Sequence, residues 1–399
     1  MIQFSRNMKA KTLLISLLIL CFILNGCKKS DPILLNSGST YSISVDSTFY
    51  TVTNNDNSSA GSEILFALDT KTVGKLFLAD ENGSLIKEKS VGSDVQNLQK
   101  WNYNGEIRYT YFLSRGAITL DSILGIELGY EYICDTSLNI LDSVKFQSFN
   151  NINATEIDTH EFILLGDHHY ICETYYQEKP DNIPDSLHPA PGVKVAACII
   201  QEVNNGVVVF QWDAAKFPEF YTSSQENNNF SDLTITHDYL HLNSICVDSS
   251  DNNLIVSFRN LNEIVKLNRQ TGDIMWRLGG NTSDFPQTGD EFFLRQHYVR
   301  KIENGNTLIF LDNGLDKTRN YSRILEFQLD ENAKTISSFK SFQIPDKFIQ
   351  FAGSVQKNGD EYFIGGGSAK YAVRVNYKTN KILLRLNLYY SSYRTLEYE

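Results

Sequence analysis

Short runs of β-branched and aromatic residues, separated by turns rich in Asn, Asp and Gly, dominate the chain after residue 42. Such runs are typical of β-strands joined by tight turns, whereas the periodicity of amphipathic helices is nearly absent. Strand–turn–strand segments recur roughly 45 to 70 residues apart along the chain. The pattern therefore predicts an all-β protein built from repeated antiparallel hairpins. The six segments are residues 75–90, 130–146, 197–212, 264–278, 324–342 and 373–388.

A second hairpin precedes each of the last five segments. Two hairpins per repeat and six repeats predict a six-bladed β-propeller of four-stranded antiparallel blades, in which each blade buries its faces against its neighbours. A long two-sheet sandwich is the alternative, but sandwiches do not repeat a hairpin pair at this period. Residues 42–90 are the least regular, which fits a ring closed by strands from both ends of the chain. The preceding hairpins are residues 101–113, 160–176, 241–259, 297–314 and 351–367.

Residues 1–26 have the features of a secretory signal, with three basic residues before the apolar run 12–24. The run ends in Asn25-Gly26-Cys27, which resembles a bacterial lipoprotein signal peptide whose cysteine becomes the lipidated first residue. An ordinary signal peptide with an incidental cysteine is the alternative. We therefore expect a signal peptide over 1–26, a tether over 27–41 and the propeller over 42–399. The predicted location is the bacterial cell envelope, with Cys27 anchored in the outer membrane and the side it faces left open.

The charge balance excludes some partners. The chain has 36 Lys+Arg against 47 Asp+Glu, a formal charge of −11, which becomes −14 when the three basic residues of 1–26 are removed. An acidic surface repels phosphate backbones, so we expect no nucleic-acid binding. No polybasic patch offers a site for lipid headgroups either, so the membrane attachment is expected through Cys27 alone.

Four cysteines lie in apolar, strand-like runs of the predicted propeller: Cys134, Cys172, Cys198 and Cys246. None of them has the C-x-x-C spacing of a metal site. An exported protein can oxidise such cysteines, and four of them allow three pairings. Isolated buried thiols and disulfides both stay open.

Three of the seven histidines occupy one position of the repeat. His160, His241 and His297 each stand at the start of the first hairpin of a blade. Because the innermost strand of a blade lines the central channel, these side chains are expected to converge at one end of the axis. A lone histidine at a strand start is usually structural, but three in register favour a site. We assign no role to His168, His169 or His188, and His237 is a candidate for supporting the site from outside it.

Polar residues near His241 suggest the chemistry. Arg259 follows the run 254–258, and its planar, permanently charged guanidinium suits a tetrahedral oxyanion. Asn243 lies two residues after His241, on the same side of the strand, and can donate a further hydrogen bond. Arg259 counts against a metal held by the histidines, and no metal-binding or nucleotide-binding motif is present, so we expect no metal and no cofactor. An ion pair between blades is the alternative for Arg259. Histidines with an arginine fit transfer of a charged group through an imidazole nucleophile.

The same residues resemble the arylsulfotransferase family of β-propellers, in order over roughly residues 157–395. The ordered set of short motifs carries the resemblance better than any one of them. The matching motifs are H-E-F at 160–162, H-L-N-S at 241–244, S-F-R at 257–259, T-G-D-I-M-W-R-L-G-G at 271–280, S-D-F at 283–285, Q-H at 296–297, F-L-D-N-G at 310–314, Tyr321-Ser322-Arg323 and Ser392-Tyr393-Arg394.

The resemblance implies a ping-pong transfer of a sulfuryl group from an aryl sulfate to a phenolic acceptor, without a nucleotide sulfate donor or a metal. The histidine at the position of His297 attacks sulfur and becomes a sulfohistidine. The counterparts of His160, His241, Asn243 and Arg259 hold the sulfuryl oxygens and manage protons. The implied partners are small aryl sulfates and phenols.

Two other functions stay open. A non-catalytic propeller would bind a glycan, peptide or sulfated ligand in the same pocket, and a hydrolase would pass the sulfuryl group to water. The complete histidine, asparagine and arginine set favours the transferase, because a binding module needs no imidazole nucleophile in register. Larger family members carry an N-terminal sandwich domain that mediates dimerisation, and only a short tether is expected here, so the oligomeric state stays open. Tyr298 follows the predicted nucleophile where relatives often carry a small or acidic residue, and is expected to narrow the pocket.

Overall fold

The computed structural model describes residues 48–54, 61–115, 120, 125–302, 307–345 and 347–399. These residues all belong to one compact unit, and the first strand begins at Tyr50, inside the predicted propeller range of 42–399. The predicted signal peptide, the lipidation site Cys27 and the tether lie outside the described residues. Within the described part of the chain, no helix is long and apolar enough to span a bilayer.

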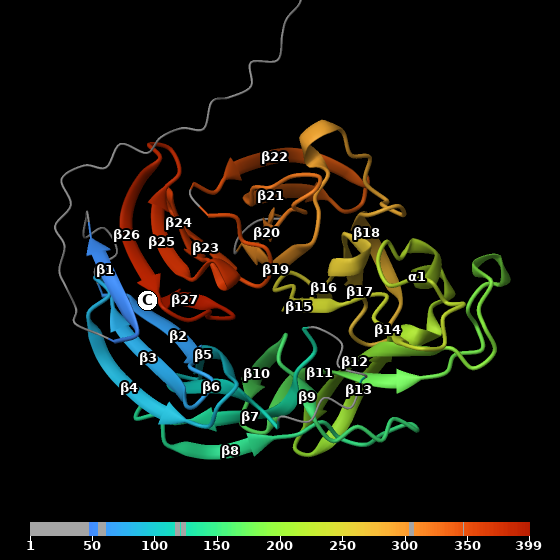
Figure 1. Cartoon of the computed structure of the whole chain (residues 1–399), viewed down its shortest axis with the longest axis horizontal. Helices are drawn as coiled ribbons and strands as arrows, with labels where there is room; N and C mark the ends of the chain where they lie inside the picture. The colour runs from blue at the N-terminus through green and yellow to red at the C-terminus, as the bar shows by residue number, and fades with distance from the viewer. Residues whose placement is uncertain (1–47, 55–60, 116–119, 121–124, 303–306, 346) are drawn as a thin grey trace, which may run out of the picture. The chain divides into compact units, whose positions relative to one another are not determined.

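Six β-sheets surround a central axis (Figure 1), which confirms the six-bladed propeller predicted from the repeat. Within blades 2 to 5 the strands follow one another outward from the axis in chain order. The strands of blades 2, 3 and 4 are β5 (Val95–Tyr103), β6 (Glu106–Ser114), β7 (Leu128–Cys134) and β8 (Ile140–Val144); β10 (Phe162–Gly166), β11 (His169–Glu178), β12 (Lys194–Asn204) and β13 (Val207–Asp213); and β15 (Leu242–Val247), β16 (Leu254–Phe258), β17 (Glu263–Leu267) and β18 (Ile274–Gly279).

Strands from both ends of the described chain close the ring, as the irregular first repeat predicted. The last strand, β27 (Thr395–Tyr398), pairs with β2 and is the innermost strand of blade 1. The first strand, β1 (Tyr50–Asn54), pairs with β26 at the outer edge of blade 6. The remaining strands of blades 1, 5 and 6 are β2 (Glu63–Asp69), β3 (Gly74–Asp80) and β4 (Leu85–Val91); β19 (Gln296–Ile302), β20 (Thr307–Asp312), β21 (Arg323–Asp330) and β22 (Thr335–Gln343); and β23 (Ser354–Asn358), β24 (Glu361–Gly365), β25 (Tyr371–Asn376) and β26 (Lys381–Leu388).

Three blades carry a fifth strand in addition to the predicted four. In blade 6 this strand is β1, and in blades 2 and 3 it is a two-residue strand of the connection to the next blade. β9 (Ile157–Asp158) pairs with β7, and β14 (Thr236–His237) pairs in parallel with β12. Each connection is thereby fixed to the blade that it leaves, directly before one of the predicted site histidines.

The hydrophobic core lies between neighbouring blades. Central strands are covered on both faces, so β16 and β17 are buried along their whole length, whereas the outer strand β4 alternates between exposed and half-buried residues. Each fully buried leucine, isoleucine or phenylalanine stabilises this packing by about 1.5–3 kcal/mol. Cys134, Cys172, Cys198 and Cys246 are free thiols in the structure.

Helical turns are confined to the connections. The one α-helix among the described residues, α1 (Pro218–Ser223), follows β13 and begins with a proline, which fits the first helical position because its missing N–H is not needed there. The 3₁₀ turns are η1 (Asp185–Leu187), η2 (Ala214–Lys216), η3 (Arg259–Leu261), η4 (Gly289–Glu291) and η5 (Gly367–Ala369).

Candidate active site

A pocket of about 470 Å³ opens at the end of the axis where the innermost strands begin. The structure brings His160, His241 and His297 together in its lining, as the repeat predicted, although they are far apart in the sequence. The rings of His160 and His241 lie 4.9 Å apart between centroids, nearly perpendicular to one another. The ring of Tyr393 lies 5.8 Å from His160 and 5.4 Å from His297, so one tyrosine contacts both.

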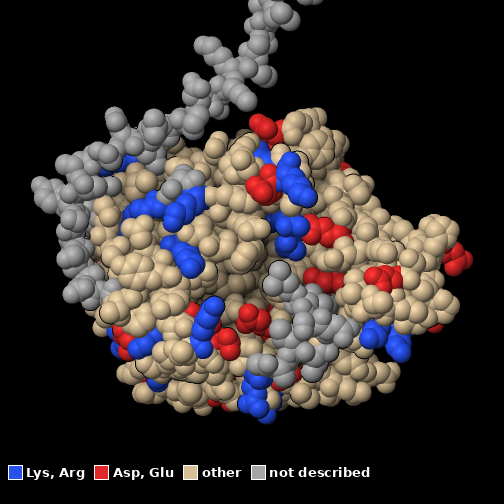
Figure 2. Space-filling view, viewed as in Figure 1, with Lys and Arg blue, Asp and Glu red and all other residues tan. Residues whose placement is uncertain are grey.

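The mouth of this pocket is more basic than the chain as a whole. Figure 2 shows a hollow near the centre of this face, with both basic and acidic side chains around it. Such a local excess of positive charge attracts anionic ligands even though the whole protein is acidic. The charged side chains that line the pocket are Lys71, Arg259, Arg295 and Lys370, with Asp69 and Glu127.

Two of the histidines are held by the same local arrangement. The connection into blade 3 passes through β9, and there the carboxylate of Asp158 accepts hydrogen bonds from the backbone N–H and Nδ1 of His160. The connection into blade 4 passes through β14, and Asp238 accepts from the backbone N–H of His241 at 3.1 Å and contacts its Nδ1 at 2.7 Å. In both rings the aspartate binds Nδ1, so Nε2 is the nitrogen left for chemistry.

The aspartate also influences the charge of His241. Burial lowers the pKa of His241 below its ordinary value, while the neighbouring Asp238 carboxylate acts in the opposite direction. The imidazole is therefore neutral at rest, with its proton on Nδ1, and its charged form has a carboxylate partner. A histidine with these properties can accept a proton and return it.

His297 has a different environment. Its Nδ1 donates to the carbonyl oxygen of Gly353 at 2.8 Å, because a carbonyl can only accept. Nε2 then carries the lone pair and accepts from the hydroxyl of Tyr393 at 3.0 Å. Burial, with the nearby Arg394 guanidinium, lowers the pKa of His297 well below its ordinary range. His297 is thus a neutral imidazole whose Nε2 is unprotonated, which is the form a nucleophile requires.

The backbone that presents His297 is fixed by Gln296. The Gln296 amide nitrogen lies 3.0 Å from Ser257 Oγ, 3.1 Å from the Phe258 carbonyl and 2.9 Å from the Glu263 carbonyl, all in blade 4. Arg295 and Tyr298, which flank Gln296 and His297 in the sequence, have φ angles of 52° and 55°. Left-handed non-glycine residues cost about 1 kcal/mol or more each and often occur at functional sites.

Arg259 lines the pocket from the first position of η3, one residue beyond the end of β16. Its backbone N–H donates to the His241 carbonyl at 2.9 Å, which ties it to that histidine. Its guanidinium lies 4.0 Å from Glu226, whose two oxygens instead accept from Arg295 at 2.7 Å each. Because Arg295 satisfies Glu226, the charge of Arg259 is only loosely paired. Arg259 thus has a long ion pair with Glu226, and its alternative role as an ion pair between blades stays open.

Asn243 lies beneath the pocket and is fully buried. Its amide donates to the carbonyl oxygen of Gln296 at 2.7 Å, directly before His297. The side chain is not part of the pocket lining. In this geometry Asn243 supports the backbone of His297, and its predicted contact with a sulfuryl oxygen stays a prediction.

A buried ion-pair network lies under the histidines. Arg394 is fully buried and donates to Glu161 at 2.9 and 3.1 Å, to the His160 carbonyl at 2.7 Å and to the Asn243 carbonyl at 3.2 Å. Glu161 also accepts from Arg300 of β19 at 2.8 Å. The network joins residues of blades 3, 4 and 5 to the segment that leads into β27. It therefore couples closure of the ring to the position of the site.

Sequence reasoning missed several contributors to the site. The aspartates before His160 and His241 had a local signal, since they stand two and three residues before those histidines. Arg295 stands two residues before His297, and Tyr393 belonged to a family motif without an assigned role. The contacts of Gly353 and Tyr393 with His297 had no signal, because they span 56 and 96 positions.

Two neighbouring aromatic residues lie outside the pocket. The ring nitrogens of His237 lie 3.0 and 2.9 Å from the carbonyl oxygens of Asn227 and Asp232, so this histidine holds the loop before β14. Tyr298 is buried, with the guanidinium groups of Arg300 and Arg394 3.8 and 4.8 Å from its ring centroid. The expectation that Tyr298 narrows the pocket is wrong, because the bulge after His297 turns this ring toward the arginines.

One group of described side chains has the spacing of metal ligands. Atoms of Asp158, His160 and Glu173 lie within 4.8 Å of one another, and all three residues are buried. The Asp158 oxygens, however, already accept from His160 and from the backbone N–H of Glu127 at 2.9 Å. Burial, with the nearby Asp158 carboxylate, raises the pKa of the Glu173 carboxyl well above its ordinary value. A protonated Glu173 accounts for the two adjacent carboxyls without an ion, and the expected absence of a metal stays a prediction.

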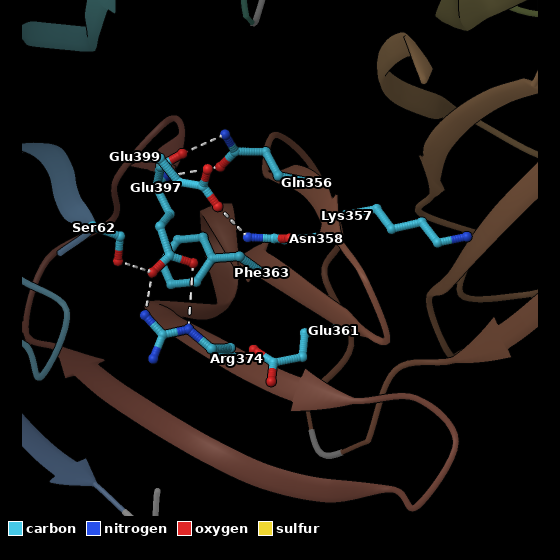
Figure 3. Close-up of a pocket in the computed structure, with 9 residues that line it drawn as sticks. All are labelled: Ser62, Gln356, Lys357, Asn358, Glu361, Phe363, Arg374, Glu397 and Glu399. Carbon is cyan, nitrogen blue, oxygen red and sulfur yellow. Dashed lines mark hydrogen bonds and ion pairs between the residues drawn. The ribbon is translucent and has the colours of Figure 1, made fainter. Parts of the chain in front are cut away.

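A second cavity, of about 280 Å³, lies at the opposite end of the innermost strands, where β23 and β27 end. Figure 3 shows the Glu397 carboxylate bound by Arg374 and, at 2.6 Å, by the hydroxyl of Ser62, while Lys357 points away from this group. The Asn358 amide donates to Glu399. These contacts join blade 6 to blade 1.

The fold and the main pocket define a β-propeller with three histidines and a group of cationic side chains in a pocket at one end of its axis. The family model described as arylsulfotransferase (ASST) matches residues 140–398. The chain belongs to the arylsulfotransferase family, which confirms the resemblance seen in its motifs. A search of the curated proteins gives no significant match.

Three of the solved structures that are similar to this chain have low sequence identity to it. One is a protein of unknown function from Bacteroides caccae, with 11% identity, a TM-score of 0.46 and coverage of 84% of this chain and 98% of that chain. Another is the nidogen/laminin complex, with 10% identity, a TM-score of 0.43 and coverage of 84% and 98%. A third is a catalytically inactive virginiamycin B lyase from Staphylococcus aureus with quinupristin, with 11% identity, a TM-score of 0.39 and coverage of 85% and 99%. At these scores the likenesses carry no argument about function.

Proposed function

We propose that the protein transfers a sulfuryl group from an aryl sulfate to a phenolic acceptor, in two steps, through a sulfohistidine at His297. The observation that carries this proposal is the unprotonated Nε2 of His297 in a pocket that also holds two aspartate-bound histidines and the loosely paired Arg259. Membership of the family agrees with this reaction class.

In the first step Nε2 of His297 attacks sulfur, so that an N–S bond forms while the bond between sulfur and the aryl oxygen breaks. The electron pair of that bond leaves with the aryl oxygen as a phenolate. Arg259, which lines the same pocket, is placed to bind sulfuryl oxygens and to stabilise their charge in the transition state. Fixed cations in a site shielded from water contribute much of the rate enhancement in transfers of this kind.

In the second step the acceptor phenol loses its proton to Nε2 of His241, and its oxygen attacks the sulfur of the sulfohistidine. The N–S bond breaks and its electron pair returns to His297. The imidazolium of His241 is stabilised by Asp238 at 2.7 Å, and its proton passes to water. His160, bound in the same way by Asp158, is assigned the same capacity on the other side of the sulfuryl group.

The proposal is tested with a soluble form that lacks residues 1–27 and a chromogenic aryl sulfate. We expect phenol release that depends on an added phenol acceptor and that is lost in His297→Asn. Release without an acceptor would identify a hydrolase instead. No release and no labelled histidine with any aryl sulfate would leave a binding propeller and refute the transferase.

We further propose that the protein is held at the bacterial outer membrane by a lipid on Cys27. The Asn25-Gly26-Cys27 ending of the apolar run supports this proposal, as does the absence of a polybasic patch in the sequence. A single acyl chain binds membranes only marginally, so stable anchoring requires more than one chain on the modified cysteine.

A further inference from the structure

A closed ring of three hydrogen bonds joins His297 to Tyr393. His297 Nδ1 donates to the Gly353 carbonyl at 2.8 Å, and the Gly353 N–H donates to the Tyr393 carbonyl at 2.9 Å. The Tyr393 hydroxyl then donates to His297 Nε2 at 3.0 Å. The imidazole is thereby held at both nitrogens, and the lone pair required for attack is occupied by a hydroxyl proton.

The neighbouring Arg394 holds Tyr393 in position. Tyr393 precedes Arg394, whose guanidinium is fixed by Glu161 and by the carbonyl oxygens of His160 and Asn243 and lies 5.1 Å from the tyrosine ring centroid. Burial raises the pKa of the Tyr393 hydroxyl above its ordinary value, so it remains a donor at neutral pH. Tyr393 is nevertheless part of the pocket lining, and its hydroxyl contacts His297, which lines the same pocket.

Resting on the sulfuryl transfer proposed above, we propose that Tyr393 is a catalytic residue that selects anionic sulfuryl donors. In the free protein its hydroxyl occupies the Nε2 lone pair of His297. When an aryl sulfate binds, the hydroxyl donates to a sulfuryl oxygen instead and the lone pair becomes free to attack.

The selectivity follows from the strengths of the two hydrogen bonds. A bond from a hydroxyl to a charged oxygen is roughly twice as strong as a neutral one. An anionic sulfate ester therefore replaces the bond that it breaks with a better one. A neutral electrophile of similar size offers no such replacement, so its reaction with His297 is opposed by the resting hydrogen bond.

Tyr393→Phe separates the proposed role of Tyr393 from a structural one. The proposed role predicts that this substitution changes two rates in opposite directions. The first readout is the rate at which diethyl pyrocarbonate, a neutral electrophile, modifies His297, followed by peptide mass spectrometry. We expect this rate to rise about three- to ten-fold, which corresponds to loss of one ordinary hydrogen bond. The second is kcat for sulfuryl transfer, which we expect to fall about 100-fold, as for loss of one donor to a developing oxyanion.

Tyr389→Phe is the matched control. Tyr389 belongs to the same segment, is 50% exposed and lies outside the pocket lining, so both rates should stay at their wild-type values. The inference is overturned if both rates fall in Tyr393→Phe, as a merely structural tyrosine predicts, or if neither rate changes. The modification of His297 by diethyl pyrocarbonate needs no sulfuryl transfer. The proposed function and the proposed role of Tyr393 can therefore fail separately. Suppose that the wild type transfers no sulfuryl group but that Tyr393→Phe is still modified faster at His297. The proposed function and the selection of sulfuryl donors would then be refuted, but the hydrogen bond to Nε2 would not.

Discussion

The three histidines of the pocket differ in what binds their Nδ1. Aspartates bind it in His160 and His241, whereas a backbone carbonyl binds it in His297. A carboxylate stabilises an imidazolium, but a carbonyl gives it little support. The first two rings can therefore carry a proton during a reaction, while His297 stays neutral, with an unprotonated Nε2 that accepts from the Tyr393 hydroxyl. This difference, rather than the presence of three histidines, supports His297 as the proposed nucleophile.

Asp238→Asn tests the role of the carboxylate at His241. An asparagine amide can donate to Nδ1, which places the ring proton on Nε2 and removes the base for the acceptor phenol. We expect kcat to fall about 100-fold, within the usual contribution of a general base. Asp273→Asn, at an exposed turn of blade 4, is the control and should leave kcat unchanged. A wild-type kcat in Asp238→Asn would show that His241 is not the base.

The buried, neutral state of His297 predicts a pH dependence of stability. Its pKa is well below 6.5 in the fold, whereas the unfolded chain binds a proton near the ordinary value. The contribution of His297 to stability is therefore complete above about pH 6.5 and is lost as the pH falls. Between about pH 7 and pH 5 we expect the free energy of unfolding of the wild type to fall by about 2 kcal/mol more than that of His297→Gln. Urea denaturation at each pH measures the free energy of unfolding. Parallel pH curves for the two proteins would contradict a buried, neutral His297.

At the scale of strands and connections, the ring closes at the residues that support the site. Arg394 leads directly into β27, the innermost strand of blade 1, and pairs with Glu161 of blade 3. The backbone carbonyl of His160 accepts from the same guanidinium at 2.7 Å. Closing the propeller therefore also fixes the residues that form the floor of the pocket.

Arg394→Met tests this coupling. Removing one partner of a buried ion pair leaves a buried charge, and we expect a loss of about 3–5 kcal/mol in the free energy of unfolding. Lys378→Met, which removes an exposed pair with Asp360, should cost less than about 1 kcal/mol. Denaturant unfolding of both variants gives the comparison. Equal effects would mean that Arg394 is not a structural centre of the ring.

The elements also show what the sequence could predict. The paired hairpins and the common position of His160, His241 and His297 were predictable, because turn residues and β-branched runs repeat with the blades. The strands β9 and β14 were not, because two residues carry no periodicity. The three hydrogen bonds that link His297, Gly353 and Tyr393 were not predictable either, since they form only when blades 5, 6 and 1 meet. The expectation for Tyr298 came from the residues that relatives carry after the nucleophile, and the structure instead packs this ring against Arg300 and Arg394.

At the scale of the whole molecule, charge is distributed unevenly. The chain is acidic overall, with a formal charge of −11, yet the pocket mouth gathers four cationic side chains against two carboxylates. This arrangement favours small anions over polyanions, because the wider surface repels a long phosphate backbone. It fits a substrate of the size and charge of an aryl sulfate.

The proposed anchor predicts a location for the whole protein. In Cys27→Ser the lipid cannot be attached, so we expect the protein to leave the membrane fraction and appear in the soluble fraction of the envelope. Under the same proposal Cys21 is removed with the signal peptide, so Cys21→Ser should leave the protein in the membrane fraction. Fractionation and immunoblotting of both variants test this. A Cys27→Ser protein that remains membrane-bound would contradict the lipoprotein interpretation.

The central claim is that His297 becomes sulfated during turnover, and peptide mass spectrometry measures this directly. The protein is mixed with an aryl sulfate without acceptor, quenched under alkaline conditions and digested. We predict one sulfuryl group on the peptide that contains His297, absent from His297→Asn and lost when a phenol is added before quenching. Transfer activity without this label, or a label on another residue, would contradict the account.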